Sequence, residues 1–310
     1  MGSLVSVVIP TYGRARYINR AIESALSQVG TNVEVIVVDD NGVGTSEQIA
    51  VEEMIANYVN GGSVRYIAHM SNANGSAARN TGIEAAAGDY VAFLDDDDWF
   101  HTEKLALQVA RMKLEGAGAS LCGFSRVTES GVAMNVVPLL DDHVRRNLLA
   151  HAIDTCAGSC LVVERNVLIR VGLFDVSFVR HQDLEFLYRI ARETVICVVP
   201  ELLTSVFMHS GNQRTRRARE KECYRKHYLK VFANDIRELA PEDREFVWNS
   251  HCRGISKAYL RDWAIGNSVR WVLRASDPFS VAHGVLRDIC QSGASRFLLN
   301  RSPAPNQMSP

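Results

Sequence analysis

The sequence predicts an α/β fold, with helices flanking a mostly parallel central sheet and a C-terminal helical extension. Over about the first hundred residues, short apolar runs rich in Val and Ile alternate with segments of helical spacing, as in βαβ units. Polar residues directly follow several of these runs, and after Ser210 the pattern becomes helical and basic. We expect an α/β domain over residues 1–210, an extension over 211–300 and a disordered tail over 301–310.

The elements of the first half are predicted from their periodicity. Apolar runs of strand length are expected to alternate with amphipathic helices, and Gly61-Gly62 and Gly88 each end a helix. The predicted strands are 5–9, 33–38, 64–68 and 89–94, and the predicted helices are 15–28, 49–58 and 76–87.

The second half is less regular. We expect helices over 105–114 and 183–192 and extended segments over 119–127, 159–163 and 195–207. Pro241 and Pro278 mark breaks in the helical extension. Phe279, Ala282, Leu286 and Ile289 recur at helical spacing, which fits a core-facing helix slightly better than a helix on a membrane surface.

Charge is distributed unevenly along a chain of ordinary globular composition. The 310 residues carry a formal net charge of -1, but residues 211–310 hold 18 Lys or Arg against 10 Asp or Glu, a surplus of +8. Residues 1–210 therefore carry -9. An acidic half that recruits a cation and a basic half that meets phosphate-rich partners is one interpretation, and solvated helix faces are the other. We expect no nucleic-acid partner.

Cysteine usage and hydropathy bear on where the protein works. Seven scattered cysteines without a CxxC pair indicate reduced, mostly buried thiols. We expect no targeting segment, because Met1 to Leu4 lead directly into the first predicted strand, and no run of about 18 apolar residues is present. We expect a cytoplasmic protein and leave open a peripheral contact with the inner face of the cell membrane through the basic C-terminal region.

Four consecutive aspartates, Asp95 to Asp98, end the apolar run Tyr90–Leu94 and are followed by Trp99-Phe100. Clustered carboxylates repel one another unless a positive group lies among them. A solvated acidic turn is the alternative, but the flanking apolar and aromatic residues favour the edge of a cleft. The pattern predicts a metal and diphosphate site at the carboxyl end of a buried strand.

Other strands of the first half end in similar residues. Thr11 follows the first strand, and Asp39 and Asp40 follow the second. In open α/β sheets, ligands bind at the carboxyl edge of the strands. We therefore expect these residues and the aspartates to share one site.

Five segments, in this order and spacing, resemble the inverting nucleotide-sugar glycosyltransferases of family 2, which have the Rossmann-like GT-A fold. Together they span about the first 210 residues, and five in order are a far more specific signal than one. They are Val7 to Tyr12, Val37 to Asn41, Gly75 to Gly82 (GSAARNTG), Gly88 to Trp99 (GDYVAFLDDDDW), and Gly172 to Asp175 with His181 to Glu185.

The resemblance implies a donor-binding half over residues 1–100. Pro10, Thr11 and Tyr12 would form the loop under the nucleotide base, where the Tyr12 ring is available for stacking, although a surface aromatic in a turn is the alternative. Asp39 would accept the imide N–H of a uracil-like base, whereas Asp40 would contact the donor or hold its own loop together. Arg14 is also a donor-binding candidate. Arg79 would direct its guanidinium at the diphosphate unless it is an ordinary solvated helical arginine.

The resemblance also implies a Mg²⁺ or Mn²⁺ site, because the aspartate run matches the family's Asp-x-Asp. Asp95 would bind the ribose or support the metal, Asp96 would fill the variable place and Asp97 would ligate the ion. Asp98 would support this group or cap the following helix. His209 is a further metal candidate, and Arg214, Arg216 and Arg217 are expected either to close over the phosphates or to form a basic helix face.

Inversion requires a carboxylate that takes the proton from the acceptor hydroxyl. Asp183 matches the family's base, with Glu185 as the fallback and a simple helix cap as the structural alternative. Gln182 stands where the family usually has Glu, which puts the local acceptor contacts in doubt. The acceptor would be selected by the second half, residues 101–210, and by the basic extension.

The implied function is metal-dependent, inverting transfer of a sugar from a nucleoside-diphosphate sugar, UDP- or dTDP-linked, to a hydroxyl of a glycan or lipid-linked acceptor. Surface polysaccharide synthesis is the family-level expectation. A sugar-1-phosphate nucleotidyltransferase is one alternative, but the loop from Pro10 to Arg14 is poor in glycine for its phosphate loop. A non-catalytic nucleotide-sugar binding module is the other.

Overall fold

The structure is a computed structural model that describes residues 3–209 and 218–299, with side chains described up to residue 290. The chain divides into two compact units. The first comprises residues 1–148 and 152–214, and the second comprises residues 149–151 and 215–310. We call them the sheet unit and the helical unit.

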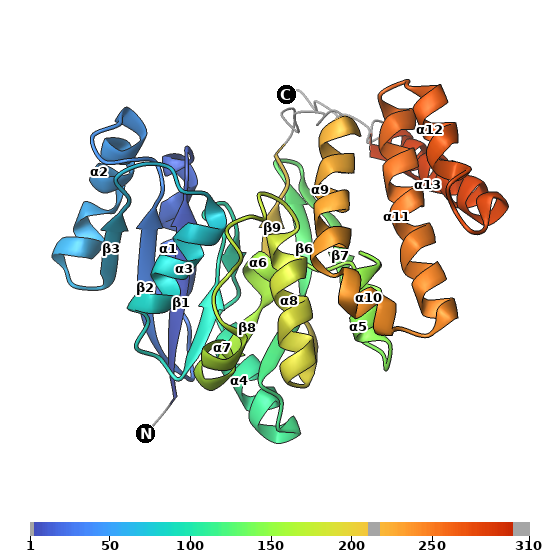
Figure 1. The fold of residues 1–310 in the computed structure, drawn as a ribbon. Coiled ribbons are helices and arrows are strands. Elements are labelled where there is room, and N and C mark those ends of the chain that lie inside the picture. Colours follow the sequence, from blue (N-terminus) through green and yellow to red (C-terminus); the bar gives the residue numbers. More distant parts are fainter. Residues whose placement is uncertain (1–2, 210–217, 300–310) are drawn as a thin grey trace, which may run out of the picture. The chain divides into compact units, whose positions relative to one another are not determined.

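Four parallel strands form one half of the sheet, in the order β3-β2-β1-β4 (Figure 1). They are β1 (Leu4–Thr11), β2 (Asn32–Asp39), β3 (Val64–Ala68) and β4 (Tyr90–Phe93). The chain moves outward from β1 to β3 and then returns to place β4 on the other side of β1. The strand order therefore reverses between β1 and β4, which is the topological switch point where α/β sheets bind ligands.

Helices cover both faces of this parallel half. They are α1 (Ala15–Leu26), α2 (Ser46–Asn60) and α3 (Gly75–Ala85). Val7 and Ile9 of β1 pack in one core cluster with Ile18 and Ile22 of α1, and Val8 points the other way, against Gly82 of α3. A strand buried on both faces has few polar positions, which explains the continuous apolar run in β1. The predicted parallel α/β fold is confirmed here.

The other half of the sheet is mixed and completes the order with β8, β6, β9 and β5. Strand β9 runs parallel to β6, whereas the pairs β4–β8, β6–β8 and β5–β9 are antiparallel, and β7 pairs with β6 at the side. The strands are β5 (Trp99–Phe100), β6 (Ala119–Thr128), β7 (Gly131–Val136), β8 (Val162–Glu164) and β9 (Ile196–Phe207). The helices are α4 (Lys104–Glu115), α5 (Val144–Leu149), α6 (Ala157–Cys160), α7 (Arg165–Val171) and α8 (Gln182–Glu193).

One predicted element of this half is partly wrong. Residues 159–163 were expected to be extended, but residues 157–160 form the single helical turn α6 and only Val162–Glu164 form a strand. The turn places Ser159 next to the aspartates, where its hydroxyl bonds to Asp98. These tertiary bonds stabilise a conformation that the small residues Gly158 and Ser159 do not specify locally.

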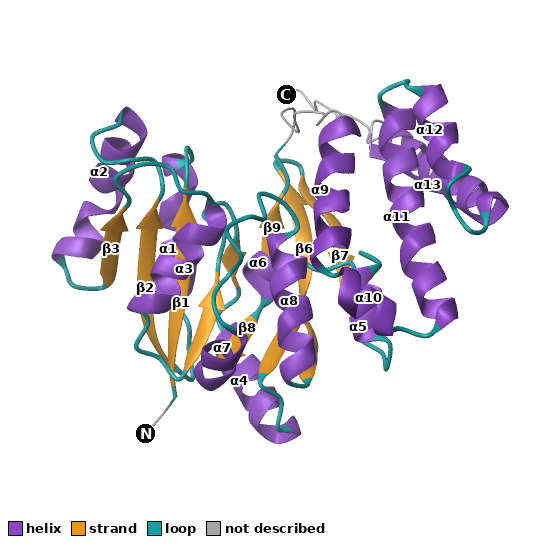
Figure 2. Cartoon of the chain, in the orientation of Figure 1, coloured by secondary structure: helices purple, strands orange, loops and turns teal. Residues whose placement is uncertain are grey.

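The helical unit contains α9 (Ala218–Val231), α10 (Ala233–Glu238), α11 (Pro241–Arg261), α12 (Ile265–Val272) and α13 (Pro278–Leu299) (Figure 2). Pro241 and Pro278 are the first residues of α11 and α13, where the missing N–H costs nothing. The core includes Trp271, Val281 and Val285. The slight preference for a core-facing stripe holds only in part, because Ile289 packs against this core whereas Phe279 and Leu286 are exposed.

Two further properties concern cysteines and membrane spans. All seven cysteines lie in the described part of the chain, none forms a disulfide, and four of them are buried. Within residues 3–209 and 218–299, no helix combines the length and the apolarity that crossing a membrane requires.

Candidate active site

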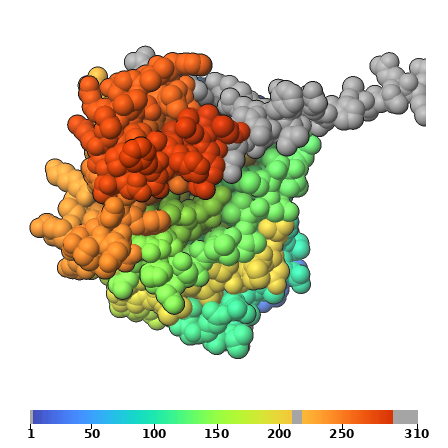
Figure 3. Space-filling view, turned by 90° about the vertical axis from the view of Figure 1, so that its right-hand side faces the viewer, coloured from blue at the N-terminus to red at the C-terminus, as the bar shows by residue number. Residues whose placement is uncertain are grey.

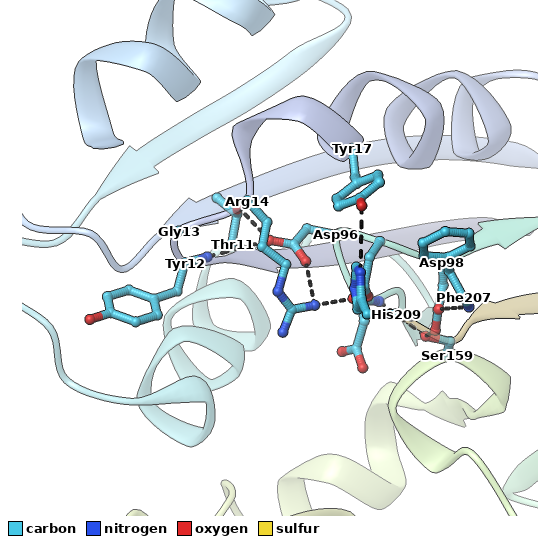
Figure 4. A network of polar contacts seen from close by, with 12 residues as sticks. Thr11, Tyr12, Gly13, Arg14, Tyr17, Asp96, Asp98, Ser159, Phe207 and His209 are labelled. Atoms are coloured by element: carbon cyan, nitrogen blue, oxygen red, sulfur yellow. Dashed lines mark hydrogen bonds and ion pairs between the residues drawn. The ribbon is translucent and has the colours of Figure 1, made fainter. Parts of the chain in front are cut away.

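The site is built at the carboxyl ends of β1 and β4, on either side of the switch point. Thr11 ends β1 and stands in register with Asp39 at the end of β2. Asp95 to Asp98 follow β4 after Leu94. Figure 4 shows Thr11, Arg14, Asp96, Asp98 and His209 converging, although they come from distant parts of the sheet unit.

Asp96 has the most contacts with the β1 loop. Its carboxylate accepts hydrogen bonds from the Thr11 hydroxyl at 2.7 Å and from the Tyr12 amide at 3.4 Å, and it pairs with Arg14 at 3.3 Å. Burial raises the pKa of Asp96 to about 7, although Arg14 and the Thr11 hydroxyl oppose that shift. Asp96, which the family resemblance puts at the variable position of Asp-x-Asp, therefore connects the end of β4 to the end of β1.

Asp97 and His209 form the second group. His209 Nε2 lies 2.7 Å from Asp97 Oδ2, and Arg14 donates to the same oxygen. The Tyr17 hydroxyl lies 3.5 Å from His209 Nδ1, so α1 supports the outer side of the imidazole (Figure 4). The predicted pair is thus brought together across 112 residues of sequence.

This donor set fits a divalent cation in part. Within the described residues, no cluster of three or more His, Cys, Asp or Glu side chains is arranged to hold a metal. Mg²⁺ sites on nucleotides nevertheless use one or two protein carboxylates and take their remaining ligands from phosphate and water. The Asp97 carboxylate meets that smaller requirement, and the adjacent His209 imidazole offers a further ligand atom.

Asp95 and Asp98 connect the aspartates to the rest of the sheet unit. Asp95 Oδ1 pairs with Arg79 Nη2 at 2.5 Å. Asp98 accepts from the Ser159 hydroxyl at 2.5 Å and from the Phe207 amide at 2.9 Å, and burial raises its pKa well above the ordinary value. The helix-cap role considered for Asp98 is wrong, because β5 intervenes and α4 begins only at Lys104.

Arg20 is a site residue that sequence reasoning missed. Its Nη2 donates to the Asp97 carbonyl oxygen at 2.6 Å, and its guanidinium lies 3.9 Å from the centre of the Trp99 ring. Arg14, Tyr17 and Arg20 are three residues apart, so the first turns of α1 direct three side chains towards the aspartates. This three-residue spacing, directly after the residues that end β1, is the sequence signal that could have identified Arg20.

Asp39 and Asp40 are both buried and fully bonded. Asp39 accepts from the Asn41 amide, the Asn41 side chain and the Tyr66 hydroxyl, at 2.8 to 2.9 Å. Asp40 accepts from His69 and from the backbone of Ala73 and Asn74, so it holds the 72–74 loop. A nucleotide base that donates to Asp39 would therefore have to share this carboxylate with Asn41 and Tyr66.

Pro10 and Tyr12 frame the outer side of this region. Pro10 is in register with Val38 of β2, so the loop begins inside the sheet. The exposed Tyr12 ring points away from the aspartates (Figure 4), as a stacking platform requires. The Asn41 side chain accepts from the Gly13 amide at 2.7 Å and connects this loop to the end of β2.

Asp183 lies in the first turn of α8, near Arg79. Arg79 is buried and contacts Asp95 and the Gly75 carbonyl, and the Gln182 amide, turned with its oxygen inward, accepts from Arg79 Nη1 at 2.9 Å. Burial raises the pKa of Asp183, although the charge of Arg79 opposes the shift. Of the four aspartates, Asp95 adds a smaller effect in the same direction as burial.

Glu185 is less suited to act as a base. It is buried, and its two carboxylate oxygens bind Arg189 at 2.5 and 2.8 Å. Both carboxylate oxygens are thus engaged by Arg189 in a bidentate pair, and a substrate hydroxyl would have to compete with that guanidinium. Of the two carboxylates, the geometry favours Asp183. Arg214, Arg216 and Arg217 lie outside the described residues.

Comparison with known proteins agrees with this site. The profile of glycosyl transferase family 2 matches residues 6–172, which is more than half of the chain. The chain belongs to glycosyl transferase family 2.

Curated relatives are named as glycosyltransferases. The chain is 30% identical over 208 residues to an uncharacterized glycosyltransferase of Rickettsia felis, a match that covers 67% of this chain but only 33% of that protein. It is 31% identical over 194 residues to the amylovoran biosynthesis glycosyltransferase AmsB of Erwinia amylovora, covering 59% of this chain and 62% of the relative. The chain thus spans a third of the Rickettsia felis protein and less than two thirds of AmsB.

Solved structures show the same fold. The mannosyltransferase PcManGT of Pyrobaculum calidifontis, in complex with GDP-Man and Mn²⁺, matches with a TM-score of 0.58 at 19% identity, over 96% of this chain and 83% of that one. Residues 1–349 of Staphylococcus aureus TarS match with a TM-score of 0.55 at 16% identity, over 97% and 93%. The GT-A fold predicted from the motifs is confirmed.

Proposed function

We propose that the chain is a metal-dependent, inverting glycosyltransferase that moves a sugar from a nucleoside-diphosphate sugar to a hydroxyl of a glycan or lipid-linked acceptor. The observation that carries this proposal is the Asp97 and His209 pair, which meets Arg14 at the switch point of the sheet. A site that holds carboxylates, an imidazole and a guanidinium together suits a metal-bound diphosphate.

The donor class is supported by neighbours of the same fold. TarS has been crystallised with UDP and with UDP-GlcNAc, and PcManGT with GDP-Man. We place the nucleotide over Pro10, Thr11 and Tyr12 and propose a pyrimidine base, UDP or dTDP, in which the imide N–H of uracil or thymine donates to the Asp39 carboxylate. Since Asp39 already binds Tyr66 and Asn41, the base would displace or share one of these donors.

Asp97 and His209 would hold the Mg²⁺ or Mn²⁺, and the ion would neutralise the charge that develops on the leaving nucleoside diphosphate. Arg14 would then turn from the carboxylates to the phosphates, which its half-exposed side chain permits. Asp95 would orient Arg79 or contact the ribose. Asp96 would hold the β1 loop against the site, because its carboxylate contacts Thr11 and Tyr12.

Asp183 would act as the base. The acceptor hydroxyl oxygen attacks the anomeric carbon from the face opposite the diphosphate, and the carbon–oxygen bond to the diphosphate breaks. The hydroxyl proton passes to the Asp183 carboxylate as the new bond forms. The raised pKa of Asp183 makes it a better proton acceptor than an ordinary aspartate.

A biosynthetic role is supported by the Erwinia relative, which is named for amylovoran biosynthesis. By analogy we propose that the chain acts in surface polysaccharide synthesis, with the acceptor selected by the second half of the sheet unit.

The test is turnover of UDP-, dTDP- and GDP-sugars with Mn²⁺. We expect slow metal-dependent hydrolysis of a pyrimidine donor to the nucleoside diphosphate, and transfer when an acceptor is supplied. Asp183→Asn should lower transfer by roughly 10²- to 10⁴-fold and leave donor binding nearly unchanged. Asp142→Asn, at an exposed carboxylate, is the matched control.

The outcomes separate the alternatives. Unchanged turnover in Asp183→Asn would show that another group is the base. Donor binding without hydrolysis or transfer would indicate the non-catalytic binding module. Calorimetry on Asp97→Ala tests the metal, because donor affinity should lose its dependence on Mn²⁺. If the donor affinity of the native protein is the same with and without Mn²⁺, the metal site is refuted.

A further inference from the structure

The helix α12 has apolar side chains on two opposite sides. On one side Trp271 is 3% exposed and, with Ala275 just beyond the helix, packs in the core of the helical unit. On the other side Ile265, Val269 and Leu273 follow one another at four-residue spacing and are 57%, 49% and 70% exposed. Residues four apart on a helix are neighbours, so these three form a continuous stripe.

Trp263 extends this stripe. It precedes α12, is 86% exposed and has a positive φ of 58°. This left-handed residue ends α11, because its amide donates to the Leu260 carbonyl and the Ala264 amide donates to the Tyr259 carbonyl. A single exposed apolar residue is ordinary, but an aromatic ring beside a continuous stripe indicates a binding surface.

The charges within the segment from Trp263 to Ser276 are positive, and one carboxylate flanks it at each end. From Trp263 to Ser276 the only charged residues are Arg270 and Arg274. Within the described residues neither arginine has a carboxylate ion pair, and Arg274 instead lies over the Trp271 ring, 4.9 Å from its centre. Nearby carboxylates have other partners: Asp262 accepts from the Ala218 amide and Asp277 from the Ser280 amide.

The neighbouring helix α13 adds a second exposed apolar group. Phe279 in its first turn is 90% exposed, and Leu286 lies two turns further on. Arg287 follows Leu286 and is also exposed. Figure 3 shows the atoms of α12 and α13, in orange to red, gathered on the face that it presents.

We propose that Trp263, Ile265, Val269 and Leu273, with Arg270 and Arg274, form a docking surface for an anionic lipid membrane, which we call the α12 face. Amphipathic helices that lie in the membrane interface combine a buried apolar stripe with basic flanks, and Trp prefers that depth. The arginines would place their aliphatic stems along the lipid surface and their guanidinium groups at the lipid phosphates. The inference does not depend on the donor, the metal or Asp183.

A second copy of the chain suits the α12 face less well. A stable dimer buries about 800 Å² on each partner, far more than four side chains supply. A two-fold contact would also bring Arg270 and Arg274 of one copy towards those of the other, with no carboxylate from this segment between them. An anionic surface removes that repulsion.

The test is co-sedimentation of the 310-residue chain with vesicles. We expect binding to phosphatidylcholine vesicles that contain phosphatidylglycerol, much weaker binding to pure phosphatidylcholine, and loss of binding at high salt. The double variant Val269→Ser with Leu273→Ser should reduce partitioning by at least about ten-fold, because it removes two inserted side chains. Arg270→Glu should reduce it by well over five-fold, since one basic residue contributes about that factor and the variant also adds a negative charge.

Leu139→Ser is the control, because Leu139 is more exposed than Val269 and Leu273 but lies in the sheet unit. Its partitioning should equal that of the native protein, and circular dichroism should confirm that every variant is folded. Insertion of Trp263 should also shift the tryptophan emission to the blue, and Trp263→Phe should remove that shift. Equal binding by native protein and double variant would overturn the proposal. So would a dimer in light scattering that Leu273→Ser dissolves while vesicles fail to bind.

Discussion

Arg14 contacts two neighbouring carboxylates from the loop that follows β1. Asp96 and Asp97 together keep the pKa of its guanidinium raised, although burial acts in the opposite direction. The site therefore carries part of its charge compensation in the protein itself, before any metal or donor binds. A donor phosphate would compete with these carboxylates for Arg14, and a divalent ion on Asp97 would make that exchange favourable.

The pH dependence of transfer should report Asp183. Its pKa is raised above 3.8 by burial, and a base must be deprotonated, so the rate should fall as the pH drops towards that raised value. The acid limb of kcat/KM should therefore lie above pH 3.8. In the control variant Asp142→Asn, the acid limb of kcat/KM should lie at the same pH as in the native protein. A limb at or below 3.8, in protein that circular dichroism shows to be folded, would contradict the assignment.

Arg20 should act through the backbone of Asp97. Arg20→Met removes the bond to the Asp97 carbonyl and the contact with the Trp99 ring, so calorimetry should show metal-dependent donor affinity weakened by about ten-fold. Arg16→Met, on the same helix but exposed, should change it little. The unfolding temperature of the two variants should be similar. A large loss of stability in Arg20→Met without loss of metal affinity would indicate a purely structural arginine.

At the scale of elements, α3 must approach β1 closely for Arg79 to reach Asp95. Gly82 permits this approach, because a Cβ at that position would lie 2.2 Å from Val8 Cγ1. Val8 is fully buried in the central strand and has no space to move away. The position of a site residue thus depends on a small residue one turn further along the same helix.

Gly82→Ala should lower the free energy of unfolding by about 1–3 kcal/mol, even though alanine favours helix formation, because overpacking outweighs propensity. Denaturant unfolding measures this change. Glu84→Ala, at an exposed position of α3, should stay within about 0.5 kcal/mol of the native protein. An unchanged midpoint for Gly82→Ala would show that α3 moves away from β1 at little cost.

At the scale of the whole molecule, the two units have separate cores. The sheet unit is built on the cluster around Val7 and Ile22, and the helical unit on the cluster around Trp271 and Val285. Separate cores allow separate cooperative transitions, so the protein is not expected to unfold as a single two-state system.

Calorimetric unfolding should therefore show two transitions, and a pyrimidine nucleoside diphosphate with Mn²⁺ should raise only the one that belongs to the sheet unit. At a ligand concentration 100 times the dissociation constant, the stabilisation should be about 2.7 kcal/mol. Asp97→Ala should abolish the shift, whereas Asp142→Asn should retain it. A shift of both transitions by the same amount would show that the units unfold together.

Much of the fold was predictable because its signals are local. The runs at 5–9, 33–38 and 64–68 and the helical spacing after each of them are properties of neighbouring residues, and the structure has strands and helices at these places. The short elements β5 and β7 had no such signal. They exist because a partner strand offers hydrogen bonds: β9 pairs with Trp99 and Phe100, and β6 pairs with residues 131–136.

The sequence by itself determined that carboxylates follow the fourth strand and that the chain has the family's motifs, since both are patterns along the backbone. Only the tertiary structure decided which groups meet there. His209 contacts the Asp97 carboxylate, the Ser159 hydroxyl donates to Asp98, and Arg20 donates to the Asp97 carbonyl. The tertiary structure likewise decided that Phe279 and the α12 stripe face solvent. These outcomes depend on contacts between residues far apart in sequence, and such contacts leave no local periodicity.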